Sequence, residues 1–313
     1  MLFALALIPV IGLLIFIYFK DKKEKEPFGF LIGLFFAGVS TITSAVIIES
    51  IGQALLGLFL PAKSATYMVI LSLFVIGPAE ELGKFIVLRL LTWHNRHFDY
   101  SYDAIVYAVF VSLGFAAIEN IGYVFSNGFG TAVLRMFTAI PGHACFAVLM
   151  GFFYGRSKYA KLTKNSGKYI GFTALAMIVP IIAHGIYDAI IMGPGASGNS
   201  TLAGLSLIVW IGYLIGLFTV SIILVIRSSR HDFCVVTLPD NKTQTIYRPV
   251  VAGTWTCACG TPNNLNFCSQ CGRPRPMINT SWFCPRCRTL CVYNFCGNCG
   301  CPRDHLSSMS SMT

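Results

Sequence analysis

Charged side chains that can exchange protons interrupt an otherwise apolar segment. The stretch VIGPAEELGKF places Glu80, Glu81 and Lys84 there, just after a Gly77-Pro78 pair that predicts a bend in a helix. Ionised side chains are costly at bilayer depth, so they face a bundle interior or a polar cavity. Lys84 follows Glu80 by four residues and Glu81 by three, so it can neutralise one carboxylate on the same helical face. The other carboxylate is then available for chemistry.

Three further apolar segments carry groups that can activate a water molecule. LGFAAIENIGY holds Glu119 and Asn120, IPGHACF holds His143, and AHGIYDAI holds His184 and Asp188. The last two are four residues apart, hence on one helical face, where the carboxylate can accept a ring N–H. Carboxylates and imidazoles in one polar chamber can take the proton of a water and stabilise an oxyanion.

Each of these residues also has a structural interpretation. Glu81 and Lys84 can form a buried ion pair. His143 can be a hydrogen-bonded histidine between helices, and Glu119 can bond backbone groups freed at a kink. Glu49 ends the second apolar segment, where we expect the membrane interface. The joint occurrence of these groups in successive segments favours a functional site.

The elements that position these groups are membrane helices. Of 313 residues, 55% are hydrophobic and 12% charged, and the mean hydropathy is +0.68. A helix of about 20 residues crosses the hydrocarbon core. We therefore predict an all-α polytopic membrane protein with about seven transmembrane helices, at residues 2–19, 28–48, 67–91, 102–125, 132–154, 169–192 and 202–226.

The distribution of Lys and Arg predicts the orientation of these helices. Basic residues follow the first, third, fifth and seventh segments, and the remaining connections carry almost none. By the positive-inside rule the N-terminus is outside and the C-terminus is cytoplasmic. The first segment lacks a basic region before it and a cleavage site, so we interpret it as a retained anchor.

The composition changes after Arg230 and predicts three domains. Residues 1–230 form the membrane domain, 231–254 a linker or small hairpin, and 255–313 a small C-terminal domain of tandem zinc ribbons. The last part contains an internal repeat, WTCACGTPNNLNFCSQCGRP and WFCPRCRTLCVYNFCGNCGCP. Two cysteine knuckles held apart by a short hairpin supply four thiolates for a tetrahedral zinc ion, and cytoplasmic thiols stay reduced. The predicted ligands of two structural zinc ions are Cys257, Cys259, Cys268 and Cys271, and Cys284, Cys287, Cys296 and Cys299.

Two further thiols, Cys291 and Cys301, can compete as ligands. Such ribbons usually bind partners. Arginines of the repeat permit contact with nucleic acid, yet no pattern of stacking aromatic residues accompanies them. We therefore expect recruitment of a cytoplasmic protein partner rather than of nucleic acid.

The motifs of the membrane domain resemble those of a known family. In chain order they are EExxK (Glu80, Glu81, Lys84), FxxxE (Phe115, Glu119), His143 and HxxxD (His184, Asp188). This order resembles the PrsW-type intramembrane proteases, distant relatives of the CAAX-processing and bacteriocin-immunity membrane proteases. The resemblance extends over most of residues 1–230.

The resemblance implies an intramembrane endopeptidase in a bacterial cell membrane, which hydrolyses membrane-anchored protein substrates such as anti-sigma factors. It implies a water activated by a glutamate or bound to a metal, and it leaves the active-site metal open. The residues that it assigns to catalysis are Glu80, Glu81, Glu119, His143, His184 and Asp188, with Lys84 and Asn120 in support and the two histidines as candidate metal ligands.

Two other functions fit the same residues. Chains of Glu, His and Asp also form proton relays, which indicates a proton-coupled transporter, although no inverted repeat is visible. In a non-catalytic sensor or scaffold, the zinc ribbons are the functional part and the polar core is structural.

Overall fold

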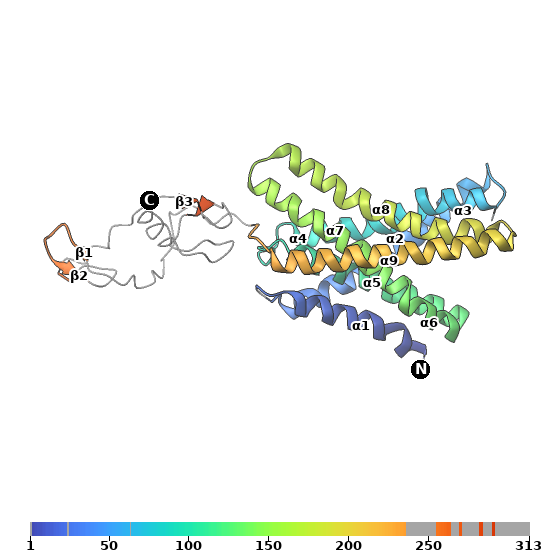
Figure 1. Ribbon diagram of the computed structural model, residues 1–313, viewed down its shortest axis with the longest axis horizontal. Helices are drawn as coiled ribbons and strands as arrows, with labels where there is room; N and C mark the ends of the chain where they lie inside the picture. Colours follow the sequence, from blue (N-terminus) through green and yellow to red (C-terminus); the bar gives the residue numbers. More distant parts are fainter. Residues whose placement is uncertain are drawn as a thin grey trace, which may run out of the picture. The chain divides into compact units, whose positions relative to one another are not determined.

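The structure is a computed structural model that describes residues 2–23, 25–62, 64–235, 255–263, 269–270, 282–283 and 290–291. The chain divides into two compact units, Met1–Val236 and Thr237–Thr313. The first unit is a bundle of helices (Figure 1). This confirms the predicted all-α polytopic fold. Its helices are α1 (Leu2–Lys20), α2 (Phe28–Gly57), α3 (Ala65–Leu71), the π-helix η1 (Ser72–Ile76), α4 (Gly77–Thr92), α5 (Asp103–Asn127), α6 (Phe129–Phe137), α7 (Ala139–Leu162), α8 (Ser166–Ala196) and α9 (Ser200–Arg230).

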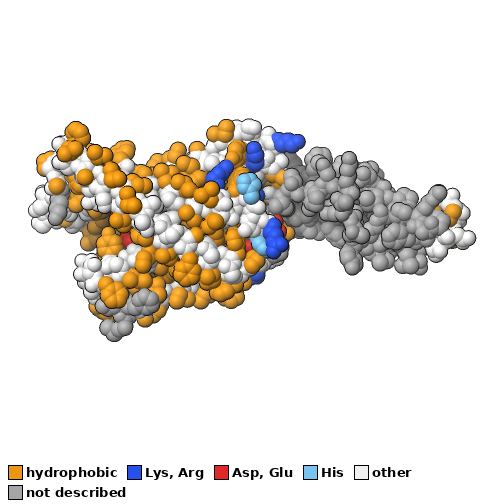
Figure 2. All heavy atoms as spheres, turned by 180° about the vertical axis from the view of Figure 1, so that it is seen from behind, with side chains coloured by type: hydrophobic (Ala, Val, Ile, Leu, Met, Phe, Trp, Pro, Cys, Tyr) orange, Lys and Arg blue, Asp and Glu red, His pale blue; other side chains and the backbone are white. Residues whose placement is uncertain are grey.

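Five helical segments of the described chain are long and apolar enough to cross a membrane: Phe28–Gly57, Asp103–Asn127, Phe129–Leu162, Ser166–Ala196 and Ser200–Arg230. The first predicted span corresponds to α1, in which Ala6–Lys20 forms a shorter apolar helix than the other five, and the third is divided among α3, η1 and α4. Figure 2 shows apolar side chains over much of the unit and Lys and Arg side chains gathered at one end. This distribution fits a lipid-facing surface with a basic interface.

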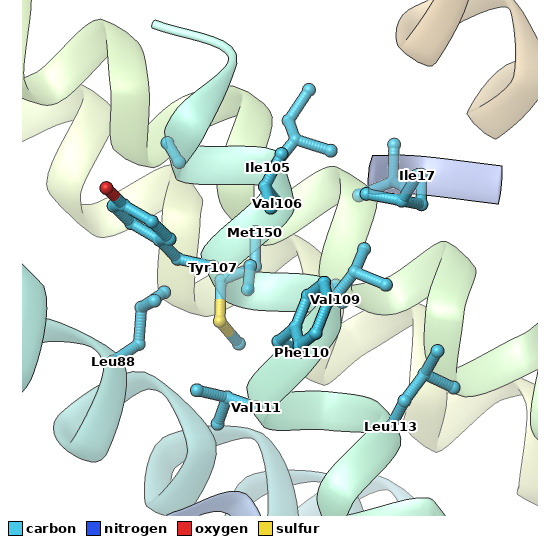
Figure 3. Packing of buried hydrophobic residues seen from close by; sticks show 14 of the residues in the cluster. Ile17, Leu88, Ile105, Val106, Tyr107, Val109, Phe110, Val111, Leu113 and Met150 are labelled. Carbon is cyan, nitrogen blue, oxygen red and sulfur yellow. The ribbon is translucent and has the colours of Figure 1, made fainter. Parts of the chain in front are cut away.

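Helix α5 forms the centre of the bundle. It contacts α1, α2, α4 and α7, and its residues from Ala104 to Ala117 are all buried. Figure 3 shows Val109, Phe110 and Leu113 of α5 and Met150 of α7, which belong to one cluster of buried apolar residues. A helix that is apolar on every side requires neighbours on every side, and this one holds the other helices in place.

The third predicted span does not form one continuous α-helix. The π-helix η1 runs directly into α4, and Pro78, which lacks an N–H, lies in the first turn of α4. The fifth predicted span is likewise two helices, α6 and α7, so His143 lies in the second turn of α7. Both breaks lie close to residues expected to be catalytic.

The second unit contains two short antiparallel hairpins among its described residues, one in each copy of the repeat. They are β1 (Trp255–Thr256) with β2 (Pro262–Asn263) and β3 (Trp282–Phe283) with β4 (Leu290–Cys291). Of the eight predicted zinc ligands, Cys257 and Cys259 are described, and the other six, with Cys301, lie outside the described residues. The two zinc ions and the domain boundaries therefore stay predictions.

The residues that follow α9 pair with the loop before α5. An isolated antiparallel bridge joins Tyr100 and Cys234. The Ser101 N–H donates to Phe233 O over 2.9 Å, and the Asp232 carboxylate accepts from both Ser101 Oγ and Tyr102 N at 2.8 Å. We call residues 232–235 the strap, because these bonds hold the end of the first unit against the loop before α5.

Candidate active site

Helix α4 positions both glutamates and the lysine on one buried face. Glu80, Glu81 and Lys84 are 5%, 0% and 1% exposed. Lys84 Nζ donates to Glu81 Oε1 at 2.8 Å and to Glu80 Oε2 at 3.1 Å. The predicted pairing across one helical face is present, and the ammonium contacts both carboxylates rather than one.

Helix α8 brings its histidine to these carboxylates. His184 Nδ1 lies 2.9 Å from Glu81 Oε1, and its Nε2 lies 3.5 Å from Asp188 Oδ2. The approach is close because glycines face each other: a Cβ on Gly185 would lie 2.9 Å from Leu73 Cα, and one on Gly77 would lie 2.9 Å from Ile181 O. Real Cβ atoms essentially never come so near.

A second group of polar residues joins the first through His143. His143 Nδ1 lies 3.3 Å from Lys84 Nζ, so it accepts a hydrogen bond from the ammonium. The other ring nitrogen, Nε2, then carries the hydrogen and donates to Glu119 Oε2 at 3.0 Å. Arg135 Nη2 donates to the same carboxylate oxygen at 2.6 Å, and its Nε donates to Asn120 Oδ1 at 2.8 Å. Glu119 thus links the histidine to an arginine.

A polar chamber of about 230 Å³ opens beside these groups. Glu80, Glu119, His143, His184 and Asp188 line it, whereas Glu81 and Lys84 lie behind its wall. Phe146 stacks on the His184 ring with centroids 4.7 Å apart and fixes that ring. Apolar lining comes from α2, η1, α7 and α8 through Ile42, Val46, Ile76, Ala139, Phe146 and Met192. An uncharged polypeptide segment fits such a lining.

All eight residues singled out from the sequence contribute to this region, and two others belong to it. Arg135 lines the chamber, and an arginine inside an apolar segment is itself the signal by which the sequence could have indicated it. Glu49 also lines the chamber, although its position at the end of a span predicted the interface. Asn120 has a supporting position, because its Nδ2 donates to Ala6 O at 3.0 Å and ties α5 to α1.

The buried donors fit a metal ion. One ligand atom from each of Glu80, Glu81, His143 and His184 lies within 4.8 Å of the others. Glu81 Oε2 is buried without a hydrogen-bond partner in the described part of the chain. A carboxylate oxygen without a hydrogen-bond partner beside two imidazoles is a donor set that zinc accepts. On the opposite side of the rings, Glu119 contacts His143 Nε2 and Asp188 contacts His184 Nε2. Lys84 contacts three of the four donors and competes with any metal for them.

Comparison with known proteins assigns this site to a family. A family model described as PrsW family intramembrane metalloprotease matches residues 26–225. The chain belongs to the PrsW family. The match contains the whole polar chamber and ends before the cysteine repeat, so the second unit is an addition to the matched region.

Three proteins named Protease PrsW illustrate the similarity. That of Clostridioides difficile (strain 630) is 34% identical over 195 residues, which cover 61% of this chain and 79% of the relative. That of Geobacillus kaustophilus (strain HTA426) is 33% identical over 184 residues, covering 59% and 76%. That of Bacillus subtilis (strain 168) is 32% identical over 183 residues, covering 58% and 79%. No solved structure matches the chain.

Membership of the PrsW family makes this chain an intramembrane protease of the metallo class. Of the three functions considered from the sequence, peptide hydrolysis is therefore the one supported. The geometry of the chamber agrees with it, because carboxylates and imidazoles converge where a polypeptide segment has room.

Proposed function

We propose that this protein cuts membrane-anchored protein substrates in the polar chamber, with Glu80 as the base that takes a proton from the attacking water. One observation carries the proposal: the Glu80 carboxylate and both histidines line the same 230 Å³ cavity. A base must lie within hydrogen-bond reach of the water that it activates, and Glu80 faces the space where that water and the substrate carbonyl meet.

The two adjacent glutamates have different roles in this proposal. Glu81 is 0% exposed and does not line the chamber, so it cannot reach substrate. Its free Oε2 instead suits a metal. Glu81, His143 and His184 would hold a zinc ion, which would polarise the scissile carbonyl and acidify a water when bound.

The remaining residues position these groups. Glu119 and Asp188 each face the Nε2 atom of one histidine, which leaves both Nδ1 atoms directed at the buried cluster. Arg135 holds Glu119 in place through a 2.6 Å ion pair. After attack, Glu80 carries the proton taken from the water and can pass it to the leaving amine, which departs when protonated.

Cleavage of a membrane-anchored reporter in proteoliposomes tests the proposal. We expect Glu80→Gln and His184→Ala to lower the rate by about 100-fold or more, the range for loss of an acid-base group. His94→Ala, the same substitution at an exposed histidine outside the chamber, should cleave at the wild-type rate. Normal cleavage by a correctly inserted Glu80→Gln variant would contradict the role of Glu80.

We also propose that the N-terminus is outside and the C-terminal tail is cytoplasmic, where the zinc ribbons recruit a protein partner. The C-terminal ends of α1 and α9 lie next to each other, because Ser229 Oγ donates to Lys20 O at 2.5 Å. This contact supports placing both ends on the same side of the membrane. Labelling of single cysteines with a membrane-impermeant reagent on intact cells tests the orientation. Cysteines placed in the tail should stay unlabelled until the cells are opened.

A further inference from the structure

A second cavity lies at the other end of α7 from the chamber. It has a volume of about 50 Å³ and includes Arg156. Arg156 follows His143 by thirteen residues, which is about 20 Å along a helix. The lining comes from α5, α7, α9 and the strap, through Ser101, Ile105, Phe152, Arg156, Arg227, Ser228, His231 and Phe233. The catalytic residues contribute nothing to it.

Most polar residues of this lining, namely Arg156, Arg227, Ser228 and His231, carry donors that have no anionic partner among the described residues. In the described chain no carboxylate forms an ion pair with Arg156, Arg227 or His231. Among the described residues Arg156 donates only to Phe152 O, at 3.0 Å, and its guanidinium stacks 3.4 Å from the centroid of the Phe152 ring. Ser228 Oγ is buried without a hydrogen-bond partner among the described residues. Guanidinium groups and a hydroxyl around one hollow are the donors that bind phosphate oxygens.

We propose that this cavity binds a phosphate group, supplied by the headgroup of an anionic phospholipid. The apolar side of the lining, Ile105, Phe152 and Phe233, gives the site the amphipathic character that a lipid requires. Basic pockets between membrane helices bind acidic headgroups, and basic residues gather at this end of the unit. Free phosphate has the same chemistry and is the other source to be distinguished.

A bound headgroup would also hold the strap. Ser101 and Phe233 both line the cavity, and the Ser101 N–H donates to Phe233 O at 2.9 Å. Ser101 Oγ in turn donates to Asp232. The lipid would therefore stabilise the point at which the cysteine-rich tail leaves the membrane domain.

Native mass spectrometry of the full-length protein tests this site. Delipidated protein is titrated with phosphatidylglycerol, with phosphatidylcholine of the same acyl chains, and with inorganic phosphate. We expect one phosphatidylglycerol to bind preferentially, and Arg156→Gln/Arg227→Gln to bind it about 30-fold more weakly, the effect of two basic residues near a membrane surface. Arg230→Gln is the matched control, because this exposed arginine of α9 does not line the cavity.

The arms of the experiment separate the outcomes. If inorganic phosphate saturates the site and phosphatidylglycerol binds no better than phosphatidylcholine, the cavity is an anion site, but its phosphate group does not come from a lipid. Equal phosphatidylglycerol binding by wild type and the double variant would overturn the proposal. Arg156→Lys/Arg227→Lys keeps both charges and should retain the preference. An unchanged thermal midpoint in phosphatidylcholine shows that each variant is folded.

Discussion

At the scale of single residues, both chamber histidines direct the same ring nitrogen at the same cluster. His143 Nδ1 lies 3.3 Å from Lys84 Nζ and His184 Nδ1 lies 2.9 Å from Glu81 Oε1. Behind them, Glu119 and Asp188 face the two Nε2 atoms. A carboxylate behind an imidazole fixes its tautomer and orientation, and this arrangement is the one that metal-binding histidines use.

The first prediction separates the two glutamates. Glu80→Gln and Glu81→Gln should both abolish cleavage of a reporter, because each removes a carboxylate from the cluster. Only Glu81→Gln should also lower the metal content of the membrane domain, since Glu81 Oε2 is the orphaned oxygen. Metal analysis beside the cleavage assay measures the difference. If Glu80→Gln loses the metal and Glu81→Gln keeps it, the proposed roles are reversed.

Much of this residue-scale arrangement could be predicted from spacing. The i, i+3 and i, i+4 relations of Glu80, Glu81 and Lys84 place their charges on one helical face, and HxxxD does the same for His184. Spacing cannot show that Arg135 reaches Glu119, because that contact depends on the break between α6 and α7. It also cannot show which of two adjacent glutamates faces the cavity.

At the scale of elements, a π-helix and a pair of glycines bring α4 and α8 together. The π-helix η1 ends where α4 begins, and π-helical turns occur frequently at functional sites. The sequence predicted a bend at Gly77-Pro78, and the structure places the irregular turn just before that pair. A proline in the sequence indicates that the helix is irregular nearby. Which residues take the irregular backbone conformation depends on packing against α8, which the sequence does not show.

The second prediction concerns this close contact. Gly185→Ala should reduce cleavage and destabilise the protein by about 1–3 kcal/mol, the usual cost of overpacking. The new Cβ would meet Leu73 Cα at 2.9 Å and Ser72 O at 3.1 Å, which are backbone atoms that cannot move independently of the helix. Gly171→Ala in the same helix is the control, because nothing lies within 4 Å of its Cβ. Equal thermal midpoints for the two variants would rule out the packing role.

At the scale of the whole molecule, acidic residues collect where the strap contacts the rest of the first unit. Burial raises the pKa of Asp21 from 3.8 to about 6, and the carboxylates of Asp232 and Asp99 add to the effect while Lys25 opposes it. Burial also raises the pKa of Asp232. The folded chain therefore binds these protons more tightly than the unfolded chain does, and ionised Asp21 destabilises the fold at neutral pH.

The third prediction follows from the raised pKa of Asp21. The thermal midpoint of wild type should rise as the pH falls from 7.5 toward 5, through the folded pKa of about 6 for Asp21. Asp21→Asn should be more stable than wild type at pH 7.5, and this advantage should shrink to about half near pH 5 and disappear only below the unfolded pKa of 3.8. Calorimetry in detergent at several pH values gives the difference between the two proteins. A constant difference across that range would show that Asp21 does not titrate as described.

The last prediction concerns the cysteine repeat. Full-length protein should contain about two zinc ions more than a chain ending after Val236, one for each set of four thiolates. The truncation belongs at Val236 rather than Arg230, because residues 232–235 bond to the loop before α5 and their loss would disturb the membrane domain.

Variants within the repeat make this count specific. Cys284→Ser/Cys287→Ser should remove about one zinc, since a tetrahedral site that loses two of its thiolates no longer holds the ion. Cys291→Ser should leave the zinc count unchanged, because the predicted set of Cys284, Cys287, Cys296 and Cys299 already supplies four thiolates. A loss of zinc in Cys291→Ser would make that residue a ligand. Disulfides in place of zinc would show that the tail does not form zinc ribbons.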